Sequence, residues 1–456
     1  MLMGGTRFQI SMPYVVAIFF FNALTAFVLY LALFTKYKPT DSFIEFRFIT
    51  LILFAPLLIK YAIHVLLAPW HPFIESRRDR KHRHITTPSV SVLIPAKNEE
   101  VGIITTITSV LQTRYPKLEI VVINDGSTDR THEVVNRFIR NYKTKNGAGS
   151  SRVLYKSVKN RGKAGALNAG LAVASGEIII TIDADSVMDG RAIEKIVKHF
   201  SNPRVASVAG NVVIGNRTRP LGFIQQLEYV YGFYLKRTDD LLNAVYIVGG
   251  AAAAYRASVI KKLGGFDETI ITEDIEISTR LQDHGYLVRY APDAIVYTEG
   301  PSDFQGLARQ RLRWKYGRLL TFYKYRHLFF SLQQRHNRYL SFIVLPIALF
   351  AEILLFLEVF LLLIFIICTV YTNDFVPLAF VIVFLGVVIT LQIITDPIAK
   401  YHKNLLLLAP AAWIVFYIID YVEYRALISS IRLILKKQKL TWQSWTRCGV
   451  FGKSAS

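Results

Sequence analysis

Carboxylates follow short apolar runs in the middle of the chain, and they are the residues best suited to chemistry. Asp183-Ala184-Asp185 follows the apolar run Ile178–Ile182. Two carboxylates separated by one residue can reach the same side of a loop and hold a hard divalent cation such as Mg²⁺. Such a cation would neutralise a diphosphate leaving group. Acidic loops are common, so the place of Asp183 and Asp185 after an apolar run is what favours a metal site over an ordinary polar turn.

Two earlier apolar runs also end in polar residues. The run Val90–Ile94 leads into Pro95-Ala96-Lys97-Asn98-Glu99-Glu100, and the run Ile120–Ile123 leads into Asn124-Asp125-Gly126. A carboxylate such as Asp125 at a strand end can accept hydrogen bonds from a nucleotide base or ribose. The alternative is turn formation, for which an Asp-Gly pair is well suited. At these strand ends we expect Pro95, Ala96, Asn98, Glu99 and Asp125 to bind a nucleotide.

A glycine-containing basic segment, Asn160-Arg161-Gly162-Lys163-Ala164-Gly165, precedes a helical stretch. Such a segment before a helix can approach phosphates, so we expect Lys163 near the nucleotide. The segment is not a Walker loop, because Ala164 replaces the hydroxyl residue that such loops need. No Gly-x-Gly-x-x-Gly follows a predicted strand either, which argues against a dinucleotide-dependent oxidoreductase.

The triplet Thr272-Glu273-Asp274 precedes another helical stretch, Ile275–Leu281. A carboxylate at a helix start often only interacts favourably with the helix dipole. The chemical alternative is a general base. Sugar transfer with inversion needs a carboxylate that takes the proton of the acceptor hydroxyl as its oxygen attacks the anomeric carbon. We expect Asp274, with Glu273 beside it, to be catalytic.

A later basic and aromatic stretch carries Gln310-Arg311-Leu312-Arg313-Trp314. Arg313 can pair with a diphosphate, and Trp314 offers an apolar face to a sugar ring. Gln310 shares a helix face with Arg313, three residues further on. The plainer interpretation is an amphipathic helix on a membrane surface, and both interpretations can hold together.

These side chains need a scaffold that brings the strand ends together. The runs Val90–Ile94, Ile120–Ile123 and Ile178–Ile182 have the apolar character of buried parallel strands, and helical stretches such as Arg130–Asn141 separate them. This alternation predicts a doubly wound, mostly parallel α/β sheet. Ligands of such sheets bind at the carboxyl ends of the strands, so we expect the carboxylates to meet at one edge.

Apolar stretches long enough to cross a membrane flank the α/β region. Two precede it, at about 13–34 and 48–69, and three follow it, at about 340–371, 376–395 and 405–428. The first is too long for a signal-peptide core. A basic run, Arg77–Arg83, follows the second stretch and places the α/β domain on the cytoplasmic side. Five spans would leave the basic tail outside, so a re-entrant or interfacial C-terminal segment is the alternative.

The composition agrees with a membrane protein. Of the 456 residues, 52% are hydrophobic, yet the formal net charge is +21, which suggests charges gathered on one side of a membrane. Nucleic-acid binding is the other usual reason for a strong basic balance, but no nucleic-acid-binding motif is present. The two cysteines offer neither a disulfide framework nor a thiol metal site. We divide the chain into a membrane region (1–75), a cytoplasmic domain with interfacial helices near its end (76–330) and a second membrane region (331–456).

In order along the chain, Asp125, Asp183-Ala184-Asp185, Thr272-Glu273-Asp274 and Gln310-x-x-Arg313-Trp314 resemble the motifs of processive family 2 glycosyltransferases. This family includes cellulose, chitin, hyaluronan and poly-N-acetylglucosamine synthases. The resemblance spans about half the chain and is strongest to bacterial poly-β-1,6-N-acetylglucosamine synthases. It implies a GT-A type domain inserted between transmembrane α-helices of the plasma or inner membrane.

The resemblance also implies a role for each matching residue. Asp125 is similar to the aspartate that contacts uracil, Asp183 to the residue near the diphosphate, and Asp185 to the residue that coordinates Mg²⁺ or Mn²⁺. Asp274 matches the catalytic base. Gln310, Arg313 and Trp314 match the motif that holds the diphosphate and the acceptor end. The acceptor is expected to contact Gly249, Gly250, Thr272 and Trp314.

The expected function is processive, inverting transfer of a sugar from a UDP-sugar, with UDP-N-acetylglucosamine favoured, into a β-linked polysaccharide that the membrane helices help to export. The expected partners are the UDP-sugar, the growing polysaccharide and the bilayer, with room for a small membrane accessory subunit and no nucleic acid. The enzymatic alternatives are a non-processive ceramide- or dolichol-type transferase and a hyaluronan-, chitin- or cellulose-type synthase. The alternative outside catalysis is a transporter or scaffold with a degenerate nucleotide-binding domain, against which the intact Asp183, Asp185 and Asp274 argue.

Overall fold

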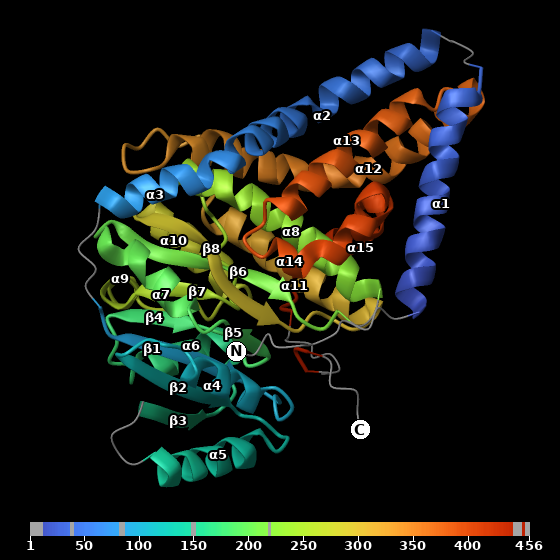
Figure 1. Ribbon diagram of the computed structural model, residues 1–456. Helices are drawn as coiled ribbons and strands as arrows, with labels where there is room; N and C mark the ends of the chain where they lie inside the picture. Colours follow the sequence, from blue (N-terminus) through green and yellow to red (C-terminus); the bar gives the residue numbers. More distant parts are fainter. Residues whose placement is uncertain are drawn as a thin grey trace.

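The centre of the molecule is an eight-stranded sheet, covered by helices on both faces (Figure 1). The structure is a computed structural model that describes residues 12–36, 41–81, 87–146, 152–217, 220–440 and 449–451. The strands lie in the order β3-β2-β1-β4-β7-β6-β8-β5. Their bounds are β1 Val90–Ala96, β2 Leu118–Asp125, β3 Arg152–Val158, β4 Ile178–Thr181, β5 Ser186–Met188, β6 Val205–Ile214, β7 Ala253–Arg256 and β8 Leu287–Thr298.

The sheet has a parallel half and a mixed half. Strands β3, β2, β1 and β4 are all parallel, as the apolar runs predicted. Strand β7 then pairs antiparallel with both β4 and β6, while β6 and β8 are again parallel and β5 is antiparallel to β8. The predicted α/β fold is confirmed, but the sheet is more mixed than the mostly parallel sheet that we expected. Three of its seven strand pairings are antiparallel.

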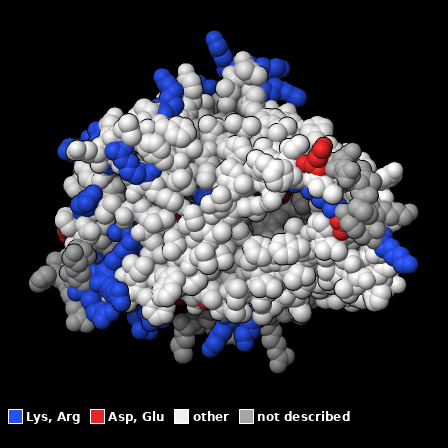
Figure 2. All heavy atoms as spheres, turned by 90° about the horizontal axis from the view of Figure 1, so that it is seen from above, with Lys and Arg blue, Asp and Glu red and all other residues white. Residues whose placement is uncertain are grey.

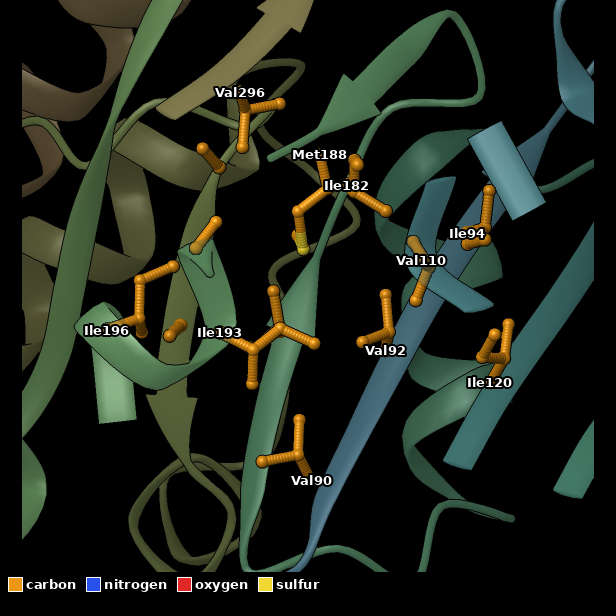
Figure 3. Close-up of a cluster of buried hydrophobic side chains, with 14 of the residues drawn as sticks. Val90, Val92, Ile94, Val110, Ile120, Ile182, Met188, Ile193, Ile196 and Val296 are labelled. Atoms are coloured by element: carbon orange, nitrogen blue, oxygen red, sulfur yellow. The ribbon is translucent and has the colours of Figure 1, made fainter. Parts of the chain in front are cut away.

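The two faces of the sheet carry separate apolar clusters, because successive side chains of a strand point to opposite faces. Val90, Val92 and Ile94 of β1 face one way and pack with helix residues such as Val110 and Ile193 (Figure 3). The intervening Leu93 belongs to the cluster on the other face. Full burial of a side chain of this kind stabilises the fold by roughly 1.5–3 kcal/mol, so the two clusters fix the sheet that carries the strand ends.

Eight helices of the described chain accompany the sheet. They are α4 Ile103–Leu111, α5 Thr131–Asn146, α6 Gly162–Leu171, α7 Ala192–Val197, α8 Pro220–Leu241, α9 Ala257–Lys262, α10 Glu273–Asp283 and α11 Phe304–Lys324. Helix α11 begins at the cap residue Asp303, whose carboxylate accepts a hydrogen bond from the Gly306 N–H at 2.7 Å.

Long apolar helices lie beside this domain. They are α1 Met12–Phe34, α2 Asp41–Leu67, α12 Leu345–Thr372 and α13 Val376–Ile394, and helix α3, His71–Lys81, continues the line of α2 (Figure 1). In the described residues, four helices are long and apolar enough to cross a membrane. Seen from above, the face that they form is mainly uncharged, with lysine and arginine gathered at its margins (Figure 2).

The last predicted span has a different shape from the others. Helices α14, Ala399–His402, and α15, Ala412–Leu435, belong to two helical segments that meet at an angle of 62°. The pair counts as a fifth span only if both arms are taken together. A bend of this size is typical of a broken span or of a re-entrant segment. A re-entrant segment is the alternative to five spans that we gave above to explain the basic tail.

The described end of the C-terminal tail lies against the α/β domain. Val450 is buried with Val213 and Tyr297, and the notch that receives it is open because Gly215 has no side chain. The Gly449 N–H donates a hydrogen bond to the Glu299 carboxylate at 3.1 Å. Residues that follow the last long helix therefore contact the same domain as the residues that precede α12.

A buried ionic cluster joins α3 to α8. Asp240 is fully buried and accepts hydrogen bonds from His71 at 3.0 Å and from Arg78 at 2.7 Å, while Arg289 lies 3.6 Å away. Burial alone would raise the pKa of Asp240, but the hydrogen bond from His71 and the charges of Arg289 and Arg78 lower it well below its ordinary value. The carboxylate is thus ionised and holds α3, which continues the apolar helix α2, to α8.

Replacing Asp240 with asparagine should destabilise the protein strongly, since it removes the buried carboxylate that pairs with His71, Arg78 and Arg289. Removing one partner of a buried ion pair costs about 3–5 kcal/mol. The measurement is thermal unfolding of the purified full chain in detergent. The matched control is Asp79→Asn, because Asp79 pairs with Lys198 at 3.2 Å but both side chains are partly exposed, so a loss below about 1 kcal/mol is expected. Equal stability of the two variants would contradict the assigned role of Asp240.

Candidate active site

A cavity of about 430 Å³ opens at the carboxyl ends of β1, β2 and β4. The strand order places these three ends side by side, as expected for a ligand site in an α/β sheet. The predicted site residues that line it are Pro95, Ala96, Glu99, Asp125, Lys163, Asp183, Asp185, Gly249, Gly250, Thr272, Glu273, Asp274, Gln310, Arg313 and Trp314. The structure therefore brings together side chains that lie up to 219 positions apart in the sequence, from Pro95 to Trp314.

Asn98 is the one predicted site residue outside the cavity lining. Its backbone has a left-handed φ of 55°, which asparagine tolerates better than most residues. Its side-chain oxygen accepts a hydrogen bond from the Thr128 N–H at 2.8 Å, and its own N–H donates to the Ser127 hydroxyl at 3.0 Å. In the structure Asn98 therefore joins the loops that follow β1 and β2, and so shapes the rim beside Asp125.

Asp125 ends β2 and faces the loop before α6. One of its carboxylate oxygens accepts a hydrogen bond from the Arg161 N–H at 2.8 Å. Burial raises the pKa of Asp125, while this hydrogen bond and the charge of Lys97 act in the opposite direction. The backbone contact fixes the orientation of the carboxylate, and Asp125 lines the cavity.

Lys163 links two of the acidic motifs. Its Nζ lies 2.6 Å from Asp183 Oδ1 and 3.0 Å from Glu273 Oε1, and all three side chains are largely buried or only partly exposed. Burial opposes the charge of the amine, but Asp183, Glu273 and Asp274 raise the pKa of Lys163 well above its ordinary value. Lys163 therefore stays protonated and holds the end of β4 and the start of α10 at a fixed separation.

Glu273 and Asp274 form the first turn of α10. Burial, together with the charge of Asp274, raises the pKa of Glu273 to about 7, although Lys163 opposes the shift. Asp274 Oδ1 accepts a hydrogen bond from the Ile275 N–H at 3.0 Å, and Asp274 lines the cavity. Two neighbouring carboxylates thus have different environments, with Glu273 tied to Lys163 and Asp274 next to the open space.

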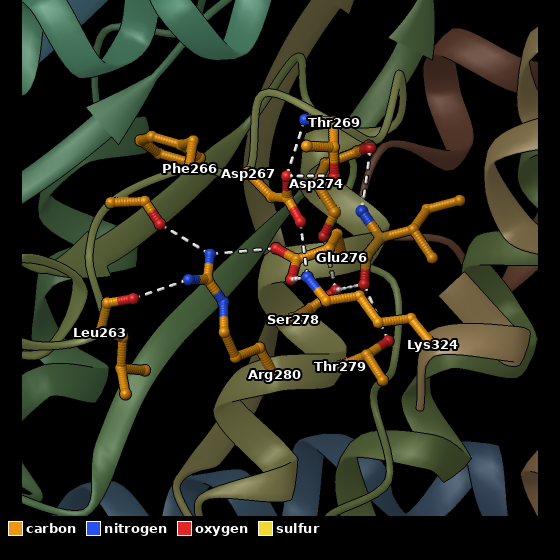
Figure 4. A network of polar contacts seen from close by, with 12 residues as sticks. Leu263, Phe266, Asp267, Thr269, Asp274, Glu276, Ser278, Thr279, Arg280 and Lys324 are labelled. Atoms are coloured by element: carbon orange, nitrogen blue, oxygen red, sulfur yellow. Dashed lines mark hydrogen bonds and ion pairs between the residues drawn. The ribbon is translucent and has the colours of Figure 1, made fainter. Parts of the chain in front are cut away.

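The helix that presents Asp274 is anchored from behind by Glu276, which is fully buried (Figure 4). Glu276 lies between Arg280 at 3.0 Å and Lys324 at 2.8 Å. Arg280 also donates to the backbone oxygens of Leu263 and Gly265, and Lys324 binds Asp267 at 2.5 Å. These contacts fix the loop before α10 to both α10 and α11.

Helix α11 contributes Gln310, Arg313 and Trp314 to the opposite wall. Arg313 and Gln310 are buried, and Trp314 is half-buried. Gly317, one turn further on, faces Thr272, and the two elements can approach closely only because Gly317 has no side chain. The helix that carries the Gln310–Trp314 motif and the loop that carries Thr272 therefore meet where Gly317 faces Thr272.

Gly250 forms the floor between the acidic residues. A Cβ atom on Gly250 would collide with Lys163 Nζ and would lie 3.7 Å from Asp274 Oδ2. Gly249, with φ +83°, turns the chain into this position. The two glycines thus leave room beside the carboxylates, in the place where the acceptor was expected.

Helix α8 supplies a wall of the cavity that sequence reasoning missed. Its lining residues are Glu228, Tyr229, Gly232, Phe233 and Lys236, spaced as one face of a helix. Lys236 Nζ lies 4.4 Å from the centre of the Phe233 ring, and burial lowers the pKa of Lys236 to about 8. The available signal was the spacing of Glu228, Gly232 and Lys236, which places two charged residues and a glycine on one helix face.

The donor atoms at the end of β4 fit a hard divalent cation. Asp183 and Asp185 present carboxylate oxygens to the same cavity, which has space left for phosphate oxygens. Oxygen ligands of this kind suit Mg²⁺ or Mn²⁺ and not a soft metal. The Ser186 hydroxyl hydrogen-bonds Asp185 Oδ1 at 3.3 Å and supports its orientation.

A second group could also hold a metal by geometry alone. His71, Glu75 and Asp240 bring three ligand atoms within 4.8 Å of one another. They lie outside the cavity lining, and Arg78 contacts both carboxylates, at 3.3 Å and 2.7 Å. Because these carboxylates already have cationic partners, the group serves as the ionic junction between α3 and α8 described above.

Two family models match the chain. Residues 91–264 match the model described as glycosyl transferase family 2, and residues 178–393 match the model described as glycosyl transferase family group 2. Together these matches include every strand except the first residue of β1, and every predicted site residue.

Curated relatives and a solved structure agree with this match. The chain is 36% identical over 240 residues to a poly-β-1,6-N-acetyl-D-glucosamine synthase of Staphylococcus epidermidis, which covers 52% of this chain and 56% of the relative. It is 35% identical over 230 residues to the synthase of that name from Staphylococcus aureus strain COL, covering 50% and 54%. The chain thus matches little more than half the length of these relatives. A mannosyltransferase from Pyrobaculum calidifontis, solved with GDP-Man and Mn²⁺, has the same fold, with a TM-score of 0.52, 21% identity and coverage of 83% of this chain and 100% of that one.

Proposed function

We propose that this chain, which belongs to the family 2 glycosyltransferases, builds a β-linked polysaccharide from UDP-N-acetylglucosamine by processive, inverting transfer. The observation that carries the proposal is the gathering of Asp274, the Asp183–Asp185 pair and the Arg313–Trp314 pair around one cavity. The relatives named as poly-β-1,6-N-acetyl-D-glucosamine synthases support the choice of sugar and of a polymeric product.

The donor nucleotide lies at the ends of β1 and β2. Asp125, oriented by the Arg161 N–H, accepts a hydrogen bond from the uracil base. Pro95, Ala96 and Glu99 line the same end of the cavity and enclose the nucleoside. A divalent cation held by Asp183 and Asp185 would neutralise charge on the diphosphate.

Asp274 acts as the general base at the other end. It accepts the proton of the acceptor hydroxyl while the hydroxyl oxygen forms a bond to the anomeric carbon. The bond between that carbon and the diphosphate oxygen breaks, and its electron pair leaves with UDP. Attack from the face opposite to UDP inverts the anomeric configuration and gives a β-linkage.

The wall formed by α11 serves both substrates. Arg313 pairs with the diphosphate as its charge increases, and Gln310 shares that face of the helix. Trp314 stacks on the terminal sugar of the acceptor, with Thr272, Gly249 and Gly250 beside it. Stacking holds the product in place for the next addition, which is what processive transfer needs.

The membrane region is proposed to span the plasma or inner membrane several times, with the domain in the cytoplasm. Helix α11, which leads into α12, belongs to that domain. Residues 449–451, at the other end of this stretch of chain, contact the same domain. The chain between them therefore returns to the side that it left, which favours crossings by α12 and α13 and a surface position for the bent α14–α15 segment. In this arrangement the helices guide the polymer outward, and a small accessory subunit can join them in the bilayer.

The experiment that tests the function is incubation of membranes containing the full chain with a panel of UDP-sugars, followed by identification of the product. The expected product is a β-linked polymer made only from UDP-N-acetylglucosamine. A polymer of another sugar would indicate a hyaluronan-, chitin- or cellulose-type synthase. A single sugar on a lipid would indicate a ceramide- or dolichol-type transferase, and no transfer from any donor would revive the transporter or scaffold.

A further inference from the structure

Three cations recur along one side of α11, and each is paired with acids from other helices. Arg311, Lys315 and Arg318 are spaced by four and three residues, so they lie on one face of the helix. Their partners come from α8, α12 and α15, namely Glu228, Glu352 and Glu423. This largely buried stripe therefore connects the cavity wall with α12 and α15, which lie outside the α/β domain.

Arg311 is the member of the stripe that touches a proposed substrate-binding residue. Its guanidinium carbon lies 4.2 Å from the centre of the Trp314 ring, which lines the cavity. The Arg311 side chain is itself only 2% exposed, so it contacts the indole from inside the protein and not from the solvent. A cation over an indole face attracts the ring and restricts its orientation.

Two carboxylates hold Arg311 in this place. Glu228 of α8 lies 2.6 Å from Nη2, and Glu423 of α15 lies 3.4 Å from Nε. Two carboxylates on different sides of a planar guanidinium fix its plane, which a single partner would not do. The orientation of Trp314 thus depends on Glu228 of α8 and Glu423 of α15, which belong to none of the sequence motifs.

Helix α15 also supports α11 along most of its length. Glu423 lies 3.0 Å from Lys315 Nζ as well, and the Ser430 hydroxyl lies 3.5 Å from the Leu312 carbonyl oxygen. Beyond the end of α15, the Gln438 carbonyl accepts a hydrogen bond from the Tyr316 hydroxyl at 3.1 Å. A shift of α15 would therefore move Arg311 relative to Trp314.

We propose that Glu423 of α15 is a positioning residue that, through Arg311, sets the stacking of Trp314 on the acceptor sugar and so the length of the product. The inference rests on the proposed transfer to a saccharide acceptor, and it assigns to α15 a part in acceptor binding. The donor side has its own supports, because Asp125 is held by the Arg161 N–H and Asp183 by Lys163, and neither of these partners belongs to the stripe.

The test uses the full chain in lipid nanodiscs, UDP-N-acetylglucosamine and short oligosaccharides isolated from the wild-type reaction. For Glu423→Gln we expect the KM of the oligosaccharide to rise about tenfold and the products to become shorter, with the KM of the UDP-sugar changed less than about twofold. Arg311→Lys keeps a charge between the two glutamates but removes the planar group over the indole, so it should have the same effect. It serves as the second variant in case Glu423→Gln folds poorly. The matched control is Glu352→Gln, which removes a more deeply buried acid from Lys315 and Arg318 but leaves Arg311 paired.

A double-mutant cycle with Trp314→Phe separates positioning from general damage. If Glu423 acts through the indole, its replacement should add little to the acceptor KM of the Trp314→Phe variant, whereas Glu352→Gln should act independently of residue 314. An unchanged acceptor KM in both Glu423→Gln and Arg311→Lys, or full additivity with Trp314→Phe, would overturn the inference alone. A wild-type enzyme that elongates no saccharide would overturn the proposed function and this inference together.

Discussion

Asp274→Asn is expected to lower the rate of sugar transfer by about a hundredfold to ten-thousandfold while leaving UDP bound as before. The range is the usual contribution of a general base. The amide has nearly the same shape as the carboxylate, and its oxygen can still accept the hydrogen bond from the Ile275 N–H, so α10 should begin unchanged. Initial rates of sugar incorporation and calorimetric titration with UDP measure the two quantities.

Asp267→Asn is the matched control for this loss. Asp267 lies seven residues earlier and binds Lys324 at 2.5 Å, but it does not line the cavity. Its replacement disturbs the same loop without removing the proposed base, so a change of no more than a few-fold is expected. Wild-type turnover by the Asp274→Asn enzyme would exclude Asp274 as the base, and loss of UDP binding would show that it serves the donor instead.

Asp185→Asn should reduce transfer at least about a hundredfold and should also weaken the dependence of UDP binding on Mg²⁺ or Mn²⁺. A divalent cation contributes several kcal/mol when it stabilises a leaving diphosphate, and each 1.36 kcal/mol is a factor of ten in rate. The amide keeps an oxygen for the Ser186 hydroxyl but loses the negative charge that binds the cation. Calorimetric titration of UDP at several metal concentrations gives a readout that does not depend on turnover.

Asp189→Asn provides the comparison on the same segment. Asp189 follows β5 and accepts a hydrogen bond from the Arg191 N–H at 3.1 Å, away from the cavity lining. Its replacement should leave the effect of the metal on UDP affinity unchanged. If Asp185→Asn behaves in the same way as Asp189→Asn, the pair at the end of β4 does not hold the metal.

The parallel half of the sheet and its acidic edge could be predicted from local pattern. The apolar runs that became β1, β2 and β4 are short and β-branched, and each is followed at once by polar residues. Parallel strands in one sheet must end at the same edge, so Asp125, Asp183 and Asp185 could be expected to meet without knowledge of the strand order. The long apolar helices could also be predicted from the sequence, because their length and hydropathy identify them.

Long-range contacts could not be predicted in this way. The ion pairs of Lys163 with Asp183 and Glu273 join residues as many as 110 positions apart, and nothing near Lys163 in the sequence indicates that it has two partners. The short strand β7 carries alanines and follows a glycine loop, so its antiparallel entry between β4 and β6 depends on packing and not on pattern. The wall formed by α8 was missed because its cavity-facing residues are mixed in type and are recognisable only once the helix is placed.

The antiparallel entry of β7 divides the molecule along one seam. Pro95, Asp125 and Asp183 belong to strands or strand ends on one side of the β4–β7 pairing, whereas Asp274 and Arg313 are carried by helices that follow β7 in the chain. Among the described residues, the four-residue register between Ile178–Thr181 and Ala253–Arg256 is the connection between the two halves within the sheet. Across the cavity the two sides are joined again by Lys163, which pairs with Asp183 on one side and Glu273 on the other, so a change at Lys163 would reach both.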